Sequence, residues 1–120
     1  MPRPAVDPER AAATKSLRQE AGRWLKAGRE AAGLTQAELA ERVGMRYYTF
    51  VSQVESGLGR VPIEMQGAWA LAVGLDPAHF ARTLLAYYEP ELNRLLFGDA
   101  AQILPDAQRA FGTRRTARPR

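Results

Sequence analysis

Hydrophobic residues between positions 17 and 98 recur at intervals of three and four, which is the period of a helix with one buried face. The same stretch lacks the two-residue alternation of β-branched side chains that a strand needs. Glycines, prolines and capping residues divide the pattern into five or six helices. Their expected ranges are 16–32, 36–43, 47–56 or 48–56, 62–73, a fifth from 77, and 91–97. We therefore expect an all-α fold in one compact domain over residues 17–98.

The second helix has the clearest local signals. Thr35 is a good N-cap, and Glu38 follows it at the spacing of a capping box. Gly44 follows the last apolar position and should end the helix. These signals predict a short helix, and a second one follows after a tight turn.

Composition changes the picture mainly at the ends of the chain. The 120 residues carry a net charge of +4, and residues 17–98 contain nine basic and nine acidic side chains. The excess positive charge therefore lies at the two ends. Residues 1–16 are expected to be a flexible arm that can merge into the first helix near Ala11, and 99–120 a basic and mostly disordered tail. The chain has no cysteine, which excludes disulfides and thiolate metal sites. No uncharged run approaches the length of a membrane span, so we expect a cytoplasmic protein.

Two short helices joined by a glycine turn form a helix-turn-helix, which binds DNA when the second helix can enter the major groove. The small residue Ala40 suits the close crossing of the two helices, and Gly44 suits the turn. The outer side of the second helix and its approach should then carry hydrogen-bonding side chains. Those available are Arg46, Tyr47, Tyr48, Thr49, Ser52 and Gln53.

These segments resemble the Cro and phage-repressor type of helix-turn-helix proteins, the XRE family. The resemblance lies in 21–44 (AGRWLKAGREAAGLTQAELAERVG), 51–57 (VSQVESG) and 69–75 (WALAVGL). It implies a lambda-repressor-like domain and a bacterial, nucleoid-associated transcriptional regulator. Two features depart from the family pattern: Gly28 replaces a large apolar residue, and the 51–57 run starts one residue late.

The resemblance also implies roles for individual residues. Gln36 would reach a DNA phosphate from the start of its helix. The base-reading residues would be Arg46, Tyr47, Tyr48, Thr49, Ser52 and Gln53. Lys26 and Arg60 would add phosphate contacts. Arg29 and Glu55 would form a structural ion pair between the first and third helices.

Several alternatives stay open at this stage. At least one of Tyr47 and Tyr48 can instead pack in the core or at a protein interface. The apolar stretch after residue 80 can form a twofold interface, or it can complete the core of a monomer. The interface residues would be Leu84, Leu85, Tyr88, Leu92, Leu95, Leu96 and Phe97.

The chain shows no phosphate-binding glycine loop, no metal-spaced cluster and no nucleophile with a partner histidine. The lone His79 is expected to be a surface or packing residue. We therefore expect no enzyme activity, no cofactor and no small-molecule ligand. The expected partners are double-stranded DNA and a second copy of the chain. The alternative function is a protein-interaction module, such as an antitoxin whose C-terminal apolar segment covers a partner protein.

Overall fold

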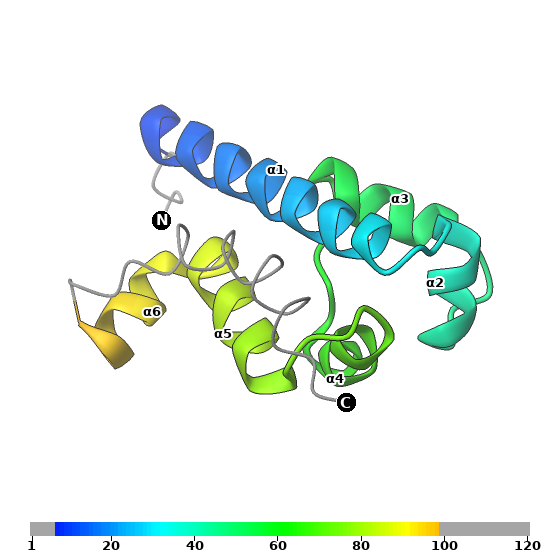
Figure 1. Ribbon diagram of the computed structural model, residues 1–120. Helices are drawn as coiled ribbons and strands as arrows, with labels where there is room; N and C mark the ends of the chain where they lie inside the picture. Colours follow the sequence, from blue (N-terminus) through cyan, green and yellow to red (C-terminus); the bar gives the residue numbers. More distant parts are fainter. Residues whose placement is uncertain (1–6, 99–120) are drawn as a thin grey trace.

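The computed structural model describes residues 7–98, and this part of the chain is all helical, as expected. Its six helices are α1 (Pro8–Ala31), α2 (Gln36–Arg42), α3 (Thr49–Ser56), α4 (Ile63–Ala72), α5 (Pro77–Tyr88) and α6 (Pro90–Phe97). Figure 1 shows α3 beside the C-terminal half of α1, with α4 and α5 across from them and α6 at the end of α5. The expectations for residues 1–6 and for the 99–120 tail lie outside the described residues.

The first helix begins earlier than expected, so the prediction of a flexible arm over 1–16 is wrong for residues 8–16. Asp7 caps the helix by accepting a hydrogen bond from the backbone N–H of Glu9 at 3.1 Å, and Pro8 occupies the first helical position. Proline is favoured there because its missing N–H would have no partner in the helix. The alanine run that follows has high helix propensity and extends the helix.

The core lies where α1 meets the other helices. Trp24 of α1 packs against Phe80 of α5, with ring centroids 5.5 Å apart, and against Tyr87 at 6.3 Å. Trp69 of α4 and Leu39 of α2 are fully buried in the same cluster. Helices α1 to α5 therefore share one core, in which α1 connects the α2–α3 pair to α5, while α6 packs against α5 outside that cluster.

Candidate nucleic-acid interface

The helix-turn-helix unit consists of α2, α3 and the residues between them. Thr35 and Glu38 form the expected capping box, with hydrogen bonds of 3.0 Å and 2.8 Å to each other's backbone N–H. Gly44 has a φ of 82°, a left-handed conformation that glycine adopts at little cost. The N–H of Met45 then donates to the carbonyl of Ala40 at 2.8 Å, which closes the end of α2.

The predicted third helix starts one or two residues later than expected. It begins at Thr49, and Tyr48 occupies its N-cap position without a side-chain hydrogen bond. Tyrosine has no short oxygen-bearing side chain of the kind that caps a helix, so residue type did not mark this boundary. Arg46, Tyr47 and Tyr48 therefore lie in the connection that leads into α3.

Most of the predicted base-reading side chains are accessible. Tyr47 is 64% exposed and Tyr48 is 54% exposed, so neither packs in the core of this chain. Arg46, Thr49 and Gln53 are also exposed, whereas Ser52 is half-buried. The Arg46 guanidinium lies 5.9 Å from the centre of the Tyr47 ring, within the range of a cation–π contact. Residues 45–54 contain no acidic side chain, so this segment itself contributes no carboxylate that would repel DNA.

A buried ion pair holds α3 against α1. Arg29 Nε and Nη2 donate to the two carboxylate oxygens of Glu55 at 2.7 Å and 3.1 Å, and Nη1 donates to the carbonyl of Leu34 at 2.8 Å. Both side chains are buried, as the family resemblance implied. The hydrogen bond to Glu55 is the main reason that the pKa of Arg29 is raised above its ordinary value. The pair therefore fixes the position of α3 while remaining charge-neutral.

Gln36 belongs to the same network. Its Nε2 donates to Glu55 Oε1 at 3.0 Å, and the side chain is half-buried. The expected role of Gln36 was a phosphate contact, but the structure gives its amide nitrogen a partner inside the chain. A phosphate contact from this nitrogen would have to replace the bond to Glu55.

The two expected phosphate-binding cations differ from each other. Lys26 is exposed on α1. Arg60 is half-buried and pairs with Glu89 at 3.1 Å, and its guanidinium lies 4.7 Å from the centre of the Tyr88 ring. The Tyr88 hydroxyl in turn accepts a hydrogen bond from the backbone N–H of Val61 at 3.2 Å. Arg60 thus fastens the α3–α4 connection to the end of α5 and is not a free cation.

Sequence reasoning missed one residue that positions the site. A Cβ atom at Gly22 of α1 would lie 2.1 Å from the backbone oxygen of Glu55 and 3.0 Å from that of Val54. The two helices cross this closely only because residue 22 has no side chain. A glycine in the middle of a helix is unfavourable, and that cost was the available signal of a close crossing.

The predicted twofold interface is partly wrong. Leu84 and Tyr88 are buried in the core of the single chain, because their side of α5 packs against α1 and α4. A second copy cannot reach them without unfolding that core. Leu85 is half-buried. The α6 side chains named with them remain exposed, at 45–65%: Leu92, Leu95, Leu96 and Phe97.

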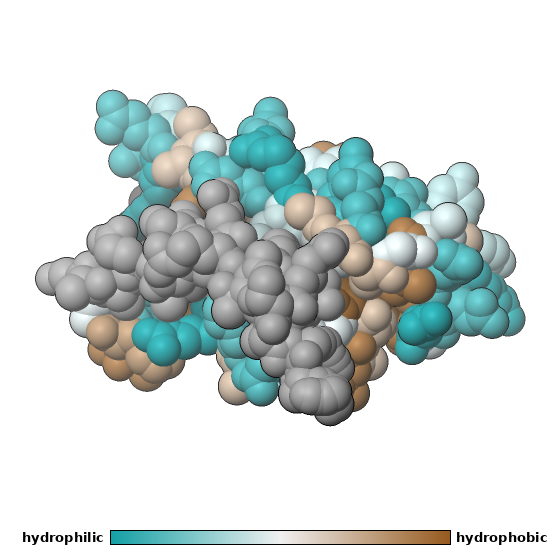
Figure 2. Space-filling view, in the orientation of Figure 1, coloured by the Kyte–Doolittle hydropathy of each residue, from teal (hydrophilic) through white to brown (hydrophobic). Residues whose placement is uncertain are grey.

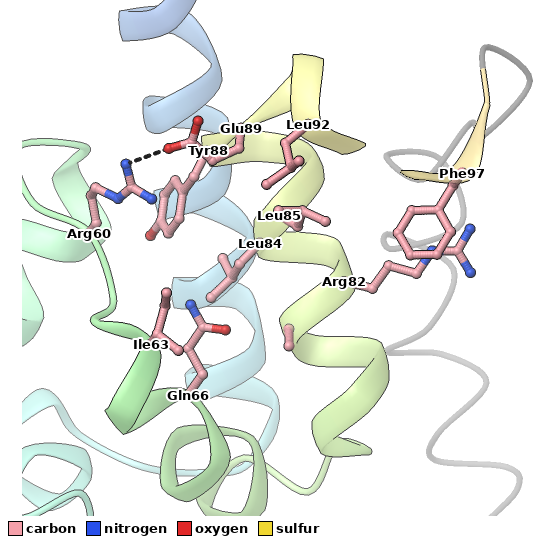
Figure 3. A pocket seen from close by; sticks show the side chains of 11 residues that line it. Arg60, Ile63, Gln66, Arg82, Leu84, Leu85, Tyr88, Glu89, Leu92 and Phe97 are labelled. Atoms are coloured by element: carbon pink, nitrogen blue, oxygen red, sulfur yellow. Dashed lines mark hydrogen bonds and ion pairs between the residues drawn. The ribbon is translucent and has the colours of Figure 1, made fainter. Parts of the chain in front are cut away.

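A cavity of about 550 Å³ lies between α4, α5 and α6. Figure 3 shows Ile63, Leu85 and Leu92 around it, with the Arg60–Glu89 pair at one end. At the other end the guanidinium of Arg82 stacks over the Phe97 ring, 4.0 Å from its centre. Figure 2 shows hydrophobic atoms at the free end of α6, while hydrophilic atoms cover the N-terminal part of α1. Within residues 7–98, Arg82 covers Phe97 only in part, and Leu95 and Leu96 of α6 remain largely exposed.

Other kinds of site find no support in the described part of the chain. Residues 7–98 contain no group of three or more His, Asp or Glu side chains placed to hold a metal ion. His79 lies half-buried on α5. None of the described helices combines the length and hydrophobicity needed to cross a membrane. No protein-family model matches the chain, and no curated protein matches it significantly.

Proposed function

We propose that this protein is a transcriptional regulator that binds a specific site in double-stranded DNA through α3 and the turn before it. The observation that carries the proposal is the exposed, hydrogen-bonding and acid-free surface of residues 46–53. It is displayed by α3 and the turn that leads into it, and Gly22 and the Arg29–Glu55 pair hold α3 closely against α1. A rigid reading surface is what base discrimination needs, because hydrogen bonds to base edges tolerate little displacement.

The side chains have the right chemistry for base reading. Arginine donates two hydrogen bonds to guanine, and glutamine both donates to and accepts from adenine. Arg46 and Gln53 are exposed residues of these two types, and one turn of α3 separates Thr49 from Gln53. We assign the readout to Arg46 and Gln53, with the two tyrosines beside them. Such a role would place the protein with the nucleoid in a bacterial cytoplasm.

A second copy of the chain would complete the regulator. Helix-turn-helix proteins that read palindromes do so as dimers, with one α3-type helix in each half-site. The exposed apolar side of α6 supports this assembly, because monomeric proteins rarely leave a large contiguous apolar patch in water. In the dimer, α6 of one copy would cover α6 of the other.

The test begins with selection of a binding site from random duplex DNA, followed by titration of the selected site and of an unrelated duplex. Arg46→Ala and Gln53→Ala should each cost about 1–3 kcal/mol on the selected site and little on the unrelated one. Arg23→Ala removes an exposed arginine of α1 outside the helix-turn-helix and is the matched control. Equal losses on both duplexes would make Arg46 and Gln53 phosphate contacts and refute their assignment as readers.

The exposed α6 also favours a second candidate, an antitoxin-like module that uses this surface to cover a partner protein. The two candidates differ in the behaviour of the purified chain. A soluble dimer that selects one duplex supports the regulator. A chain that aggregates alone, selects no DNA and copurifies with a second small protein supports the antitoxin.

A further inference from the structure

The N-terminal half of α1 extends past the C-terminal end of α3 (Figure 1). A groove of about 520 Å³ lies between them. Its charged lining residues are Arg10, Lys15 and Arg18, and no acidic side chain lines it. We call this surface the basic groove.

The groove continues the side of α1 that packs on α3. Lys15 and Arg18 lie seven and four residues before Gly22, which are helical spacings that place all three on one side of α1. At Gly22 this side meets the backbone of α3, and one turn earlier Gln19 contacts Gly57. Beyond Gly57 the described residues that line this side are those of α1 together with Leu58, so the groove begins where α3 ends. The crossing of α1 and α3 at Gly22 therefore sets the position of the groove.

The cations of the groove are incompletely neutralised. Within residues 7–98, the buried Nε of Arg18 has no hydrogen-bond partner, and the exposed Lys15 forms no salt bridge with an acidic side chain. Arg10 lies close enough to Glu91 to contribute to lowering the pKa of that carboxyl, although the hydrogen bond from Arg94 is the main cause. Lys15 and Arg18 are therefore the two cations that remain for an external anion.

The groove is continuous with the proposed reading surface. Ser56 lines the groove and is exposed on α3 three residues after Gln53, one turn along the same side. An eight-residue helix is about 12 Å long, close to the width of the DNA major groove. A phosphate strand must therefore pass near the C-terminal end of α3 when its outer side faces the bases.

We infer that the basic groove binds the phosphate backbone of the DNA that flanks the recognition site, with Lys15 and Arg18 as the contacting cations. The inference rests on the proposed function and extends it to DNA beyond the reach of α3. The groove spans roughly 12 Å of α1 from Arg10 to Arg18, a length that faces about three phosphates of one strand. An acidic polypeptide is the alternative ligand. Its binding would not explain why the groove runs through Ser56 into the reading surface of α3.

The experiment compares the selected site in a short duplex with the same site carrying ten extra base pairs on each side. The parent should bind the longer duplex more tightly. Lys15→Gln/Arg18→Gln should lose that gain, and the slope of log Kobs against log salt on the longer duplex should become shallower by roughly 2. Arg23→Gln removes one charge from an exposed position of α1 outside the groove, and it should keep most of the gain. Lys15→Gln alone keeps the experiment interpretable if loss of the half-buried Arg18 disturbs folding.

The outcomes separate the two proposals. If the parent does not distinguish the selected site from an unrelated duplex, the proposed function fails. If the parent is specific but the groove variants match it in both flank gain and salt slope, the groove inference is overturned and the proposed function stands. A third outcome is that poly-glutamate binds the parent, abolishes the gain from the flanking base pairs, and does not bind the groove variants. This result would assign the groove to an acidic polypeptide and also overturn the inference.

Discussion

The crossing of α1 and α3 at Gly22 leads to the sharpest prediction about this protein. In Gly22→Ala the new Cβ would meet the carbonyl oxygen of Glu55 at 2.1 Å and its carbonyl carbon at 2.6 Å. Ordinary contacts of a Cβ begin at 3.4 Å, so α3 must move away by more than an ångström. The atoms in the way are backbone, and no side-chain rotation can relieve the clash.

The expected cost follows from two opposing terms. Overpacking of a core contact costs about 1–3 kcal/mol, and the upper end applies when backbone must move. Alanine recovers up to about 1 kcal/mol through its better helix propensity. Displacement of α3 also lengthens the 2.7 Å bond between Arg29 and Glu55. We therefore expect a net loss of about 2 kcal/mol in the free energy of unfolding, which lowers the Tm by roughly 8–16 °C in a domain of this size.

Urea and thermal unfolding followed by circular dichroism at 222 nm measure this loss. Gly67→Ala is the matched control, because Gly67 is exposed within α4 and a Cβ there would meet no atom within 4 Å. The control should be more stable than the parent by about 0.5–1 kcal/mol. If Gly22→Ala is as stable as the parent or more stable, α1 and α3 do not cross as closely as described and the reasoning is refuted.

Three further predictions concern the ion pair, the buried tyrosine and α6. Glu55→Ala leaves the buried Arg29 without its carboxylate partner and should lower the free energy of unfolding in urea by about 3–5 kcal/mol. Glu91→Ala breaks the exposed pair with Arg94 and should change this free energy little, so equal losses in the two variants would contradict a structural role for the Arg29–Glu55 pair. Burial raises the pKa of the Tyr88 hydroxyl above its ordinary value of 10, so its contribution to stability is present below pH 10 and is lost as the pH rises through the raised pKa. Tyr88→Phe should therefore reduce the fall of the Tm at alkaline pH, and a Tm profile identical to that of the parent would contradict this role of Tyr88. Leu95→Asp should yield a helical monomer by sedimentation, with Leu71→Asp on α4 as the control; a dimer that persists places the interface elsewhere, and an unfolded chain places α6 in the core.

Much of the secondary structure follows from signals within a few residues of each boundary. The capping box at Thr35 and the glycine at 44 set the limits of α2 through backbone hydrogen bonds that any local segment can form. Asp7, Pro8 and Glu9 are equally clear start signals, so the early start of α1 was predictable from sequence, although the prolines led us to expect an arm. The start of α3 was less accessible, because Tyr48 provides no side-chain cap.

Features that depend on contacts between distant segments were decided by the tertiary structure alone. The role of Gly22 depends on the backbone of Glu55, which lies far along the chain, and no local pattern contains that distance. Likewise, Leu84 and Leu95 are both leucines at helical spacing, yet α1 and α4 cover the first and leave the second exposed. Arg60 is a residue type that commonly binds phosphate, but the packing of α5 places the carboxylate of Glu89 beside it. Local sequence specifies which residues form helices, whereas the choice of which side is buried and which charge is paired is made only when the helices meet.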